Sequence, residues 1–262
     1  MGETIVLVLL DIDGTLLNSS HRIEADTINA ISNYNGANQF VLCSARKPSS
    51  TNLIAKQLNI NEKIIICYNG ALIMEREKKI FERPLSVQIV AYILGTAQKY
   101  NLTINVYSND SWIVNELNSY VLNEAKIIGE MPLKINDVLE AANLIVHKIL
   151  LLGNEARLNL IKNELKTING ITFCNSKEGY LEITSLYANK RKAFEYLLEY
   201  LSVNVEDSLA IGDGPNDLEL LKCVGIGIAM DNAPLEVKNV AKYVTLSNDE
   251  NGVAIALTKF LN

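Results

Sequence analysis

The chain has 262 residues, of which 48% are hydrophobic and 21% are charged, a balance typical of a soluble globular enzyme with one large or two modest domains. Its formal net charge of -6, without any cluster of lysine and arginine, argues against a nucleic-acid-binding protein. No apolar run approaches the roughly 18 residues needed to cross a bilayer, and no basic leader precedes the first apolar stretch, so we expect a cytoplasmic protein that does not bind membranes.

The first part of the chain predicts a parallel sheet covered by helices. Short apolar runs alternate with amphipathic patterns, and continuous apolar strands separated by such helices are typical of a sheet that is buried on both faces. The expected elements are strands at 5–10, 39–43 and 64–67, helices at 24–34 and 48–58, and a small hairpin at 71–74 and 79–81. The turn dipeptide Asn69-Gly70 introduces this hairpin.

The pattern changes between about residue 83 and residue 184. A helix that Ser86 can cap is followed mainly by strands, with one more helix among them. The expected strands lie at 102–107, 112–114, 145–152, 171–174 and 180–183, and the second helix lies at 155–168. This arrangement indicates a separate α+β domain inserted into the parallel-sheet domain.

The alternation of helices and strands returns in the last part of the chain. The expected elements are helices at 190–201, 215–223, 234–241 and 252–260, and strands at 208–211 and 225–229. We therefore predict an α/β fold in which residues 1–82 and 185–262 form a Rossmann-like parallel-sheet core domain, with an inserted α+β domain at 83–184.

The segment from Asp11 to Thr15 carries two carboxylates two residues apart, directly after the first expected strand. Because side chains alternate along a strand, Asp11 and Asp13 should point the same way, and Gly14 allows a sharp turn after them. Such a pair can share one metal ion and one substrate, since one carboxylate can attack an electrophile while the other moves a proton. The alternative is an ordinary turn, because Asp, Gly and Thr are all common turn residues.

Polar side chains also follow two other expected strands, and ligand sites of open parallel sheets lie beyond the carboxyl ends of the strands. Ser44-Ala45-Arg46 offers a hydroxyl group and backbone N–H groups that could bind phosphate oxygens, although Ser44 alone is also a common residue in a loop before a helix. Asp213 and Asp217 bring further oxygen ligands to the same edge. Asp217 alone could cap a helix, whereas Asp213 lies between two glycines and has no evident packing role.

Lys190 starts the helix on which the chain re-enters the core domain. A cation at a helix N-terminus is mildly unfavourable, and this cost makes sense if acidic groups and a phosphate lie opposite it. A solvated helix-terminal lysine is the alternative interpretation. Lys192 is a competing candidate, because spacing does not choose between the two lysines.

The carboxylates of Asp11, Asp13 and Asp213 require a cation if they meet around one point. Each pair at about 4 Å repels by roughly 4 kcal/mol at an effective dielectric near 20. Mg²⁺ suits an all-oxygen ligand set and a phosphate substrate better than zinc does, since the two histidines, His21 and His147, both fall outside these loops. We therefore expect Mg²⁺ as the cofactor.

Taken together, these motifs resemble the haloacid dehalogenase-like superfamily, specifically its Cof-type phosphatases with a subclass IIB cap. The likeness covers essentially the whole chain and rests on ordered segments at 11–17, 44–46, 69–71, 189–190, 212–217, 230–238 and 248–253. Two positions depart from the family pattern: Ala45 replaces the usual glycine, and Arg191 follows Lys190 where glycine is common. Neither departure removes a catalytic group.

The resemblance implies a mechanism and a set of site residues. Asp11 would attack phosphorus to give an aspartyl-phosphate, and Asp13 would protonate the leaving alcohol and then activate water. Asp13 would contribute its main-chain carbonyl to the metal, and Lys190 would hold phosphoryl oxygens. The expected set is catalytic Asp11, Asp13 and Lys190; phosphate- or substrate-binding Ile12, Ser44, Ala45, Arg46 and Asn216; and metal-binding Asp11, Asp13, Asp213 and Asp217.

We therefore expect a Mg²⁺-dependent phosphatase that hydrolyses small phosphorylated metabolites, such as sugar phosphates or phosphorylated cofactors. Its expected partner is a small-molecule phosphomonoester, and the inserted domain is expected to close over the active site. A phosphomutase or phosphotransferase with the same aspartyl-phosphate chemistry is the nearest alternative. A non-catalytic phosphometabolite sensor is a more distant one.

Overall fold

The structure of the chain, a computed structural model, describes residues 5–60, 64–175 and 177–261. The chain divides into two compact units, each with its own sheet. The core unit comprises Met1–Phe81 and Asn189–Asn262, and the inserted unit comprises Glu82–Ala188. Among the described residues, no helix has both the length and the apolar character that a bilayer crossing needs.

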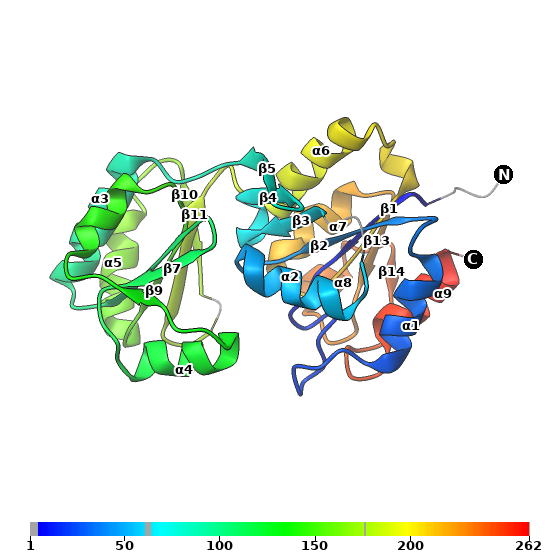
Figure 1. The fold of residues 1–262 in the computed structure, drawn as a ribbon, viewed down its shortest axis with the longest axis horizontal. Helices are drawn as coiled ribbons and strands as arrows, with labels where there is room; N and C mark the ends of the chain where they lie inside the picture. Colours follow the sequence, from blue (N-terminus) through cyan, green and yellow to red (C-terminus); the bar gives the residue numbers. More distant parts are fainter. Residues whose placement is uncertain (1–4, 61–63, 176, 262) are drawn as a thin grey trace. The chain divides into compact units, whose positions relative to one another are not determined.

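The core unit is built on an eight-stranded sheet with the order β14-β13-β12-β1-β2-β3-β4-β5 (Figure 1). The strands from β14 to β3 run parallel, and β4 pairs antiparallel with β3. The strand bounds are β1 Leu7–Leu10, β2 Gln39–Cys43, β3 Ile64–Cys67, β4 Leu72–Glu75, β5 Lys78–Glu82, β12 Ser208–Gly212, β13 Ile226–Ala229 and β14 Tyr243–Val244. Every residue of β1 is buried, as expected for a central strand covered on both faces.

Helices cover this sheet and bury its apolar side chains. The helix bounds are α1 Ala25–Tyr34, α2 Pro48–Gln57, α6 Lys190–Leu201, α7 Leu218–Cys223, α8 Leu235–Lys238 and α9 Gly252–Phe260, with 3₁₀ turns η1 Tyr68–Gly70, η3 Val205–Asp207 and η4 Pro215–Asp217. Phe194 and Leu197 of α6 pack with Leu220 of α7 on one face of the strands. Helices α1 and α9 contact each other (Figure 1).

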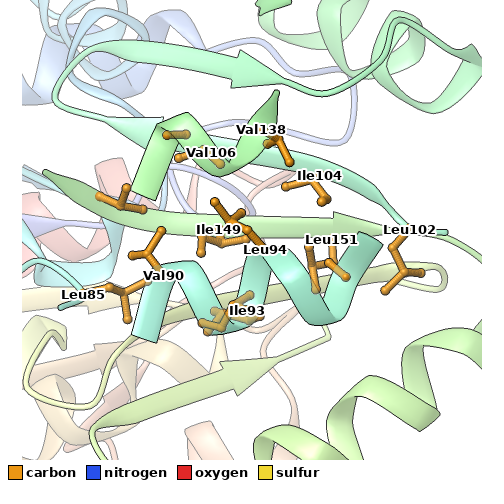
Figure 2. Packing of buried hydrophobic residues seen from close by; sticks show 14 of the residues in the cluster. Leu85, Val90, Ile93, Leu94, Leu102, Ile104, Val106, Val138, Ile149 and Leu151 are labelled. Carbon is orange, nitrogen blue, oxygen red and sulfur yellow. The ribbon is translucent and has the colours of Figure 1, made fainter. Parts of the chain in front are cut away.

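The inserted unit is a six-stranded sheet, mostly antiparallel, with the order β10-β11-β9-β6-β7-β8. The element bounds are α3 Val87–Lys99, β6 Thr103–Ser108, β7 Ser111–Val114, α4 Ser119–Ile128, β8 Leu133–Lys134, η2 Val138–Asn143, β9 Val146–Leu152, α5 Glu155–Leu165, β10 Ile171–Cys174 and β11 Tyr180–Ser185. Figure 2 shows Leu94 of α3 beside Ile149 of β9, and Val90 and Ile104 belong to the same buried cluster. The unit therefore has a hydrophobic core of its own.

The structure confirms the predicted fold class and corrects some of the expected elements. Helix α4 was not predicted, because its exposed Tyr120 and Leu122 obscure a simple amphipathic pattern, although Asn118 caps it and Gly129 ends it. The short strands β8 and β14 and the turn η2 were not predicted either. The helix expected at 215–223 is instead a 3₁₀ turn followed by the six-residue helix α7.

Candidate active site

The candidate site lies at the carboxyl edge of the core sheet, where three strands end in register. Leu10 of β1 pairs with Leu42 of β2 on one side and with Ile211 of β12 on the other. The Asp11 N–H donates to the Ile211 carbonyl oxygen at 3.0 Å, which extends this register by one residue. Residues that follow the three strands therefore share one edge, as expected for ligand sites of parallel sheets.

Gly14 brings the first loop into close approach with Asp213. Its φ is +83°, which favours glycine, and a Cβ at this position would lie 2.2 Å from Asp213 Oδ2. The next residue, Thr15, donates its hydroxyl to Asp213 Oδ1 at 3.0 Å. The segment that supplies Asp11 and Asp13 thus also orients Asp213.

Three carboxylates gather at this edge. Asp11, Asp213 and Asp217 each contribute an oxygen, and these oxygens all lie within 4.8 Å of one another. Asp217 is additionally fixed by its own loop, because its Oδ2 accepts the N–H groups of Asp213 at 3.2 Å and Gly214 at 3.0 Å. Asp11 and Asp217 are buried, whereas Asp213 is partly exposed.

Lys190 supplies the cation inside this acidic group. It is the first residue of α6 and is 1% exposed, with Nζ 2.5 Å from Asp11 Oδ1 and 2.6 Å from Asp217 Oδ1. The start of α6 comes close to the turn at Gly70, where a Cβ would lie 2.3 Å from the Asn189 carbonyl oxygen. The turn dipeptide noted in the sequence therefore allows the helix that carries Lys190 to begin beside the sheet edge.

Burial and mutual repulsion both disfavour negative charge on the carboxylates of this group. Burial raises the pKa of Asp11 well above its usual value, and the charges of Asp217 and Asp213 add to the rise despite the attraction of Lys190. Burial and the charge of Asp217 raise the pKa of Asp213 to about 6. Burial alone would lower the pKa of Lys190, but the charges of Asp11 and Asp217 outweigh it and the pKa is raised. The ammonium group of Lys190 contacts two of the three carboxylates, Asp11 and Asp217, so a further cation near Asp213 would be stabilised.

The donor set fits a hard divalent cation. The group offers carboxylate oxygens only, which are the ligands that Mg²⁺ prefers. The oxygens of Asp217 are already engaged by Lys190 and by backbone N–H groups, so Asp217 also fixes the geometry of the group. The structure thus contains a candidate metal site formed by Asp11, Asp213 and Asp217.

The side chain of Asp13 lies outside the three-carboxylate group. It is 52% exposed and pairs with Arg46, whose Nε lies 2.8 Å from Asp13 Oδ2 and whose Nη2 lies 2.6 Å from Asp13 Oδ1. The expectation that the Asp13 carboxylate meets those of Asp11 and Asp213 around one point is wrong for the side chain, because it faces Arg46 and Asp217 takes its place in the group. The contribution of the Asp13 main-chain carbonyl to the metal stays a prediction. The pairing with Arg46 was not predicted.

The remaining predicted residues are distributed around the same edge. Ser44 is buried, and its Oγ accepts the N–H of Arg46 at 3.1 Å, while Ala45 is partly buried. The Ile12 side chain is fully buried, so only its backbone could meet a ligand. Asn216 is exposed and donates to Asn69 Oδ1 at 2.9 Å, which ties two loops together.

Two asparagines that the sequence analysis gave no role complete the support of the site. Asn232 donates to the Gly14 carbonyl oxygen at 2.8 Å and lies 3.4 Å from Asp213 Oδ2. The N–H of Asn248 donates to Asn232 Oδ1 at 3.0 Å, and its side chain donates to the Leu17 carbonyl oxygen at 2.8 Å. For Asn232 the available signal was its position after β13, because polar residues that follow parallel strands meet at one edge. Asn248 follows β14, which the sequence pattern did not predict.

Comparison with known proteins identifies the family. Residues 8–257 match the model of the family described as haloacid dehalogenase-like hydrolase. The chain belongs to this family. The hydrolase is 32% identical over 256 residues to a Haemophilus influenzae protein named "Putative phosphatase", and the match covers 95% of this chain and 96% of that protein.

Two further comparisons extend over nearly the whole hydrolase. It is 27% identical over 286 residues to the 5-amino-6-(5-phospho-D-ribitylamino)uracil phosphatase YwtE of Bacillus subtilis, with 97% of this chain and 98% of that protein covered. A solved haloacid dehalogenase-like hydrolase from Bacteroides thetaiotaomicron is 31% identical, with a TM-score of 0.91 and coverage of 98% of this chain and 99% of that chain. These findings confirm the family and the fold class predicted from the motifs.

Gly14→Ala tests whether the hydrolase needs the close approach of its first loop to Asp213. We expect a loss of stability of about 1–2 kcal/mol from the positive φ and, in addition, weaker binding of a divalent cation at the candidate metal site, because the new methyl group displaces the Asp213 carboxylate. Urea unfolding and the dissociation constant for Mg²⁺ measure the two effects. Gly129→Ala is the matched control, since Gly129 has a φ of +77° and no heavy atom within 4 Å of its Cβ position. Equal Mg²⁺ binding by both variants would contradict the prediction.

Proposed function

We propose that this hydrolase is a phosphatase that hydrolyses small phosphorylated metabolites through an aspartyl-phosphate formed on Asp11. The observation that carries the proposal is the contact of Asp11 with a buried ammonium group beside a candidate metal site. A nucleophilic carboxylate and a phosphate dianion repel each other, so the reaction requires cations at this point. The Haemophilus influenzae and Bacillus subtilis relatives, both named as phosphatases, support the reaction class.

The proposed reaction has two steps. In the first, Asp13 enters as the carboxylic acid; an Asp11 oxygen attacks phosphorus, the bond from phosphorus to the leaving oxygen breaks, and the Asp13 proton passes to that oxygen, which leaves Asp13 as the carboxylate. In the second, Asp13 takes a proton from water, the water oxygen attacks the aspartyl-phosphate, and inorganic phosphate leaves with Asp11 restored. The two carboxylates are two residues apart in the loop after β1, which places both at the edge where the strands end.

The surrounding residues are proposed to hold the phosphoryl group and the nucleophile. Lys190 orients Asp11 through its 2.5 Å contact and also donates to Asp217. Its third N–H is proposed to donate to a phosphoryl oxygen. Ser44 offers its hydroxyl group, and the backbone N–H groups of Ile12 and Ala45 are further candidate donors. Arg46 and Asn216 are the proposed substrate-binding side chains at the exposed side of the edge.

Mg²⁺ is the proposed cofactor. Asp11 and Asp213 would hold it with their carboxylates and Asp13 with its main-chain carbonyl, while Asp217 supports the site and fixes Lys190. Bound there, the ion would neutralise negative charge that Asp11 and the phosphoryl group share. The hydrogen bonds that Thr15 and Asn232 donate to Asp213 would orient its carboxylate toward the ion.

We further propose that residues 83–184 act as the cap domain of this family and that the substrates carry a phosphorylated sugar or sugar-alcohol group. The name of the Bacillus subtilis relative, which contains a phosphoribityl group, supports this substrate class. Sugar phosphates and phosphorylated cofactors are the compounds to test first.

Removal of the metal tests the proposed reaction as a whole. Release of inorganic phosphate from a panel of phosphomonoesters is expected in Mg²⁺ and is expected to fall to background after chelation, with recovery when Mg²⁺ is added back. Adding sugar acceptors to the same assay separates hydrolysis from transfer, because a phosphomutase or phosphotransferase would form a new phosphoester and release less phosphate. Phosphate release that persists undiminished in chelator would refute the metal dependence.

A further inference from the structure

Arg46 and Asp13 form a two-point ion pair at the edge of the candidate site. One guanidinium engages both carboxylate oxygens, with Nε 2.8 Å from Oδ2 and Nη2 2.6 Å from Oδ1. Such a fork-to-fork arrangement is the geometry in which arginine binds carboxylates, and it is also the geometry in which arginine binds phosphate oxygens.

The loop after β2 holds the backbone of Arg46 in place. Its N–H donates to Ser44 Oγ at 3.1 Å, and its carbonyl oxygen accepts the N–H of Tyr68 at 3.2 Å. The side chain, in contrast, is 27% exposed, and its partner Asp13 is 52% exposed. A fixed backbone with a solvent-accessible head group allows the guanidinium to change partner while the loop stays where it is.

The pair conflicts with the work proposed for Asp13. To give a proton to the leaving oxygen, Asp13 must carry that proton on one of its oxygens and present that oxygen to the leaving group. In the structure both oxygens face Arg46. The contact with Arg46 must therefore loosen before Asp13 can act.

We propose that Arg46 exchanges Asp13 for the phosphate of the bound substrate, so that substrate binding itself releases Asp13 for proton transfer. This inference rests on the proposed phosphatase function and assigns Arg46 a positioning role in addition to phosphate binding. A phosphate dianion carries more negative charge than a carboxylate and offers the same two-point geometry, so it competes well for the guanidinium. The pair is partly exposed, so separating it has a cost, and the phosphate offsets that cost by making the same two-point contact with the guanidinium.

Lys190 shows why the exchange is assigned to Arg46. Its side chain is fully buried between Asp11 and Asp217, and separating it from them would leave buried charges without partners. The site thus has one cation that stays with the protein carboxylates and one that can move to a ligand. Of these two cations, Arg46 is therefore the one that can leave Asp13 when the substrate binds.

A double-mutant cycle on the binding of inorganic phosphate tests the exchange. The dissociation constant is measured by calorimetry at fixed Mg²⁺ for the wild type, Asp13→Ala, Arg46→Gln and the double variant. Asp13→Ala removes a negative charge in either background, but only in the presence of Arg46 does it also free a guanidinium. We expect Asp13→Ala to tighten phosphate binding roughly tenfold more in the wild-type background than in the Arg46→Gln background. Equal tightening in the two backgrounds would overturn the proposal.

Two further variants make the result specific. Arg46→Lys keeps the positive charge but cannot engage both oxygens of Asp13, so the cycle built on it should show clearly weaker coupling. Arg191→Gln removes a guanidinium that pairs with Glu195 on the surface of α6, and it should leave the effect of Asp13→Ala unchanged. Coupling of full size in the Arg46→Lys cycle, or loss of the Asp13→Ala effect in Arg191→Gln, would show a general charge effect and overturn the exchange.

The double-mutant cycle and the phosphate-release assay can fail independently of each other. If the wild type releases no phosphate from any phosphomonoester but the coupling is present, the phosphatase proposal fails and the exchange of partners by Arg46 stands as a binding event. If phosphate is released in a Mg²⁺-dependent manner but the coupling is absent, the exchange fails and the phosphatase proposal stands.

Discussion

Asp11→Asn is expected to lower the phosphatase turnover of this hydrolase by roughly 10,000-fold or more, the scale seen when a covalent nucleophile is removed from a site that otherwise stays intact. The amide has nearly the shape of the carboxylate but cannot form the aspartyl-phosphate. Turnover is measured by phosphate release under single- and multiple-turnover conditions. No covalently phosphorylated protein should accumulate after acid quenching.

The fold of the Asp11→Asn variant should persist. Burial and the neighbouring Asp217 and Asp213 already disfavour the charge at position 11, while Lys190 keeps its second partner, Asp217. A cooperative unfolding transition close to that of the wild type is therefore expected by circular dichroism. Asp26→Asn, on the exposed surface of α1, is the control for the chemical change alone and should retain full turnover. Substantial turnover in Asp11→Asn would rule out the covalent mechanism.

The strand-end rule accounts for most of what the sequence could predict about the candidate site. Continuous apolar runs identify central strands, and parallel strands end at one edge, so the sequence alone predicts that Asp11, Ser44 and Asp213 lie close together. The register of β1 with β2 and β12 confirms that their strands end side by side. The roles assigned to these residues stay predictions until the variants are measured.

The spacing of the motifs did not decide whether Lys190 or Lys192 is the lysine of the candidate site. Both lie in the first turn of the same helix, but a step of two residues rotates a side chain by about 200° around the helix axis. Lys190 therefore points into the sheet edge, whereas Lys192 is 55% exposed and pairs with Glu195. The buried face of this helix carries Phe194 and Leu197, which lie four and seven residues after Lys190. The apolar pattern of the helix, and not the spacing of the two lysines, was therefore the signal that favours Lys190.

The pairing of Arg46 with Asp13 and the support of Gly14 by Asn232 were out of reach for a related reason. Arg46 and Asp13 are 33 residues apart in the chain, and Asn232 and Gly14 are 218 residues apart. Loop conformations such as the left-handed Tyr68 and Asn69 decide which side chains meet, and these conformations depend on tertiary contacts. Sequence patterns predict which residues lie at the edge of the sheet, but they do not predict the hydrogen bonds between those residues.

Lys190→Met is expected to destabilise the hydrolase by about 3–5 kcal/mol in the presence of a chelator, because it leaves the buried Asp11 and Asp217 without their cation. Methionine fills a similar volume, so the loss reports charge rather than a cavity. In Mg²⁺ the loss should be smaller, since an ion bound at the acidic group supplies part of the missing positive charge. Urea unfolding with chelator and with Mg²⁺ measures both values.

Lys192→Met is the matched control on the same helix. Its ammonium group is 55% exposed and pairs only across the surface with Glu195, so we expect a change of less than about 1 kcal/mol with or without Mg²⁺. Turnover should fall by roughly 100- to 1,000-fold in Lys190→Met, as when one donor to a transition-state oxygen is removed, and should be unchanged in Lys192→Met. If the two variants unfold at the same urea concentration in chelator, then the buried ammonium group does not hold the acidic site together. In that case the need for a second cation, on which the Mg²⁺ assignment depends, would lose its electrostatic basis.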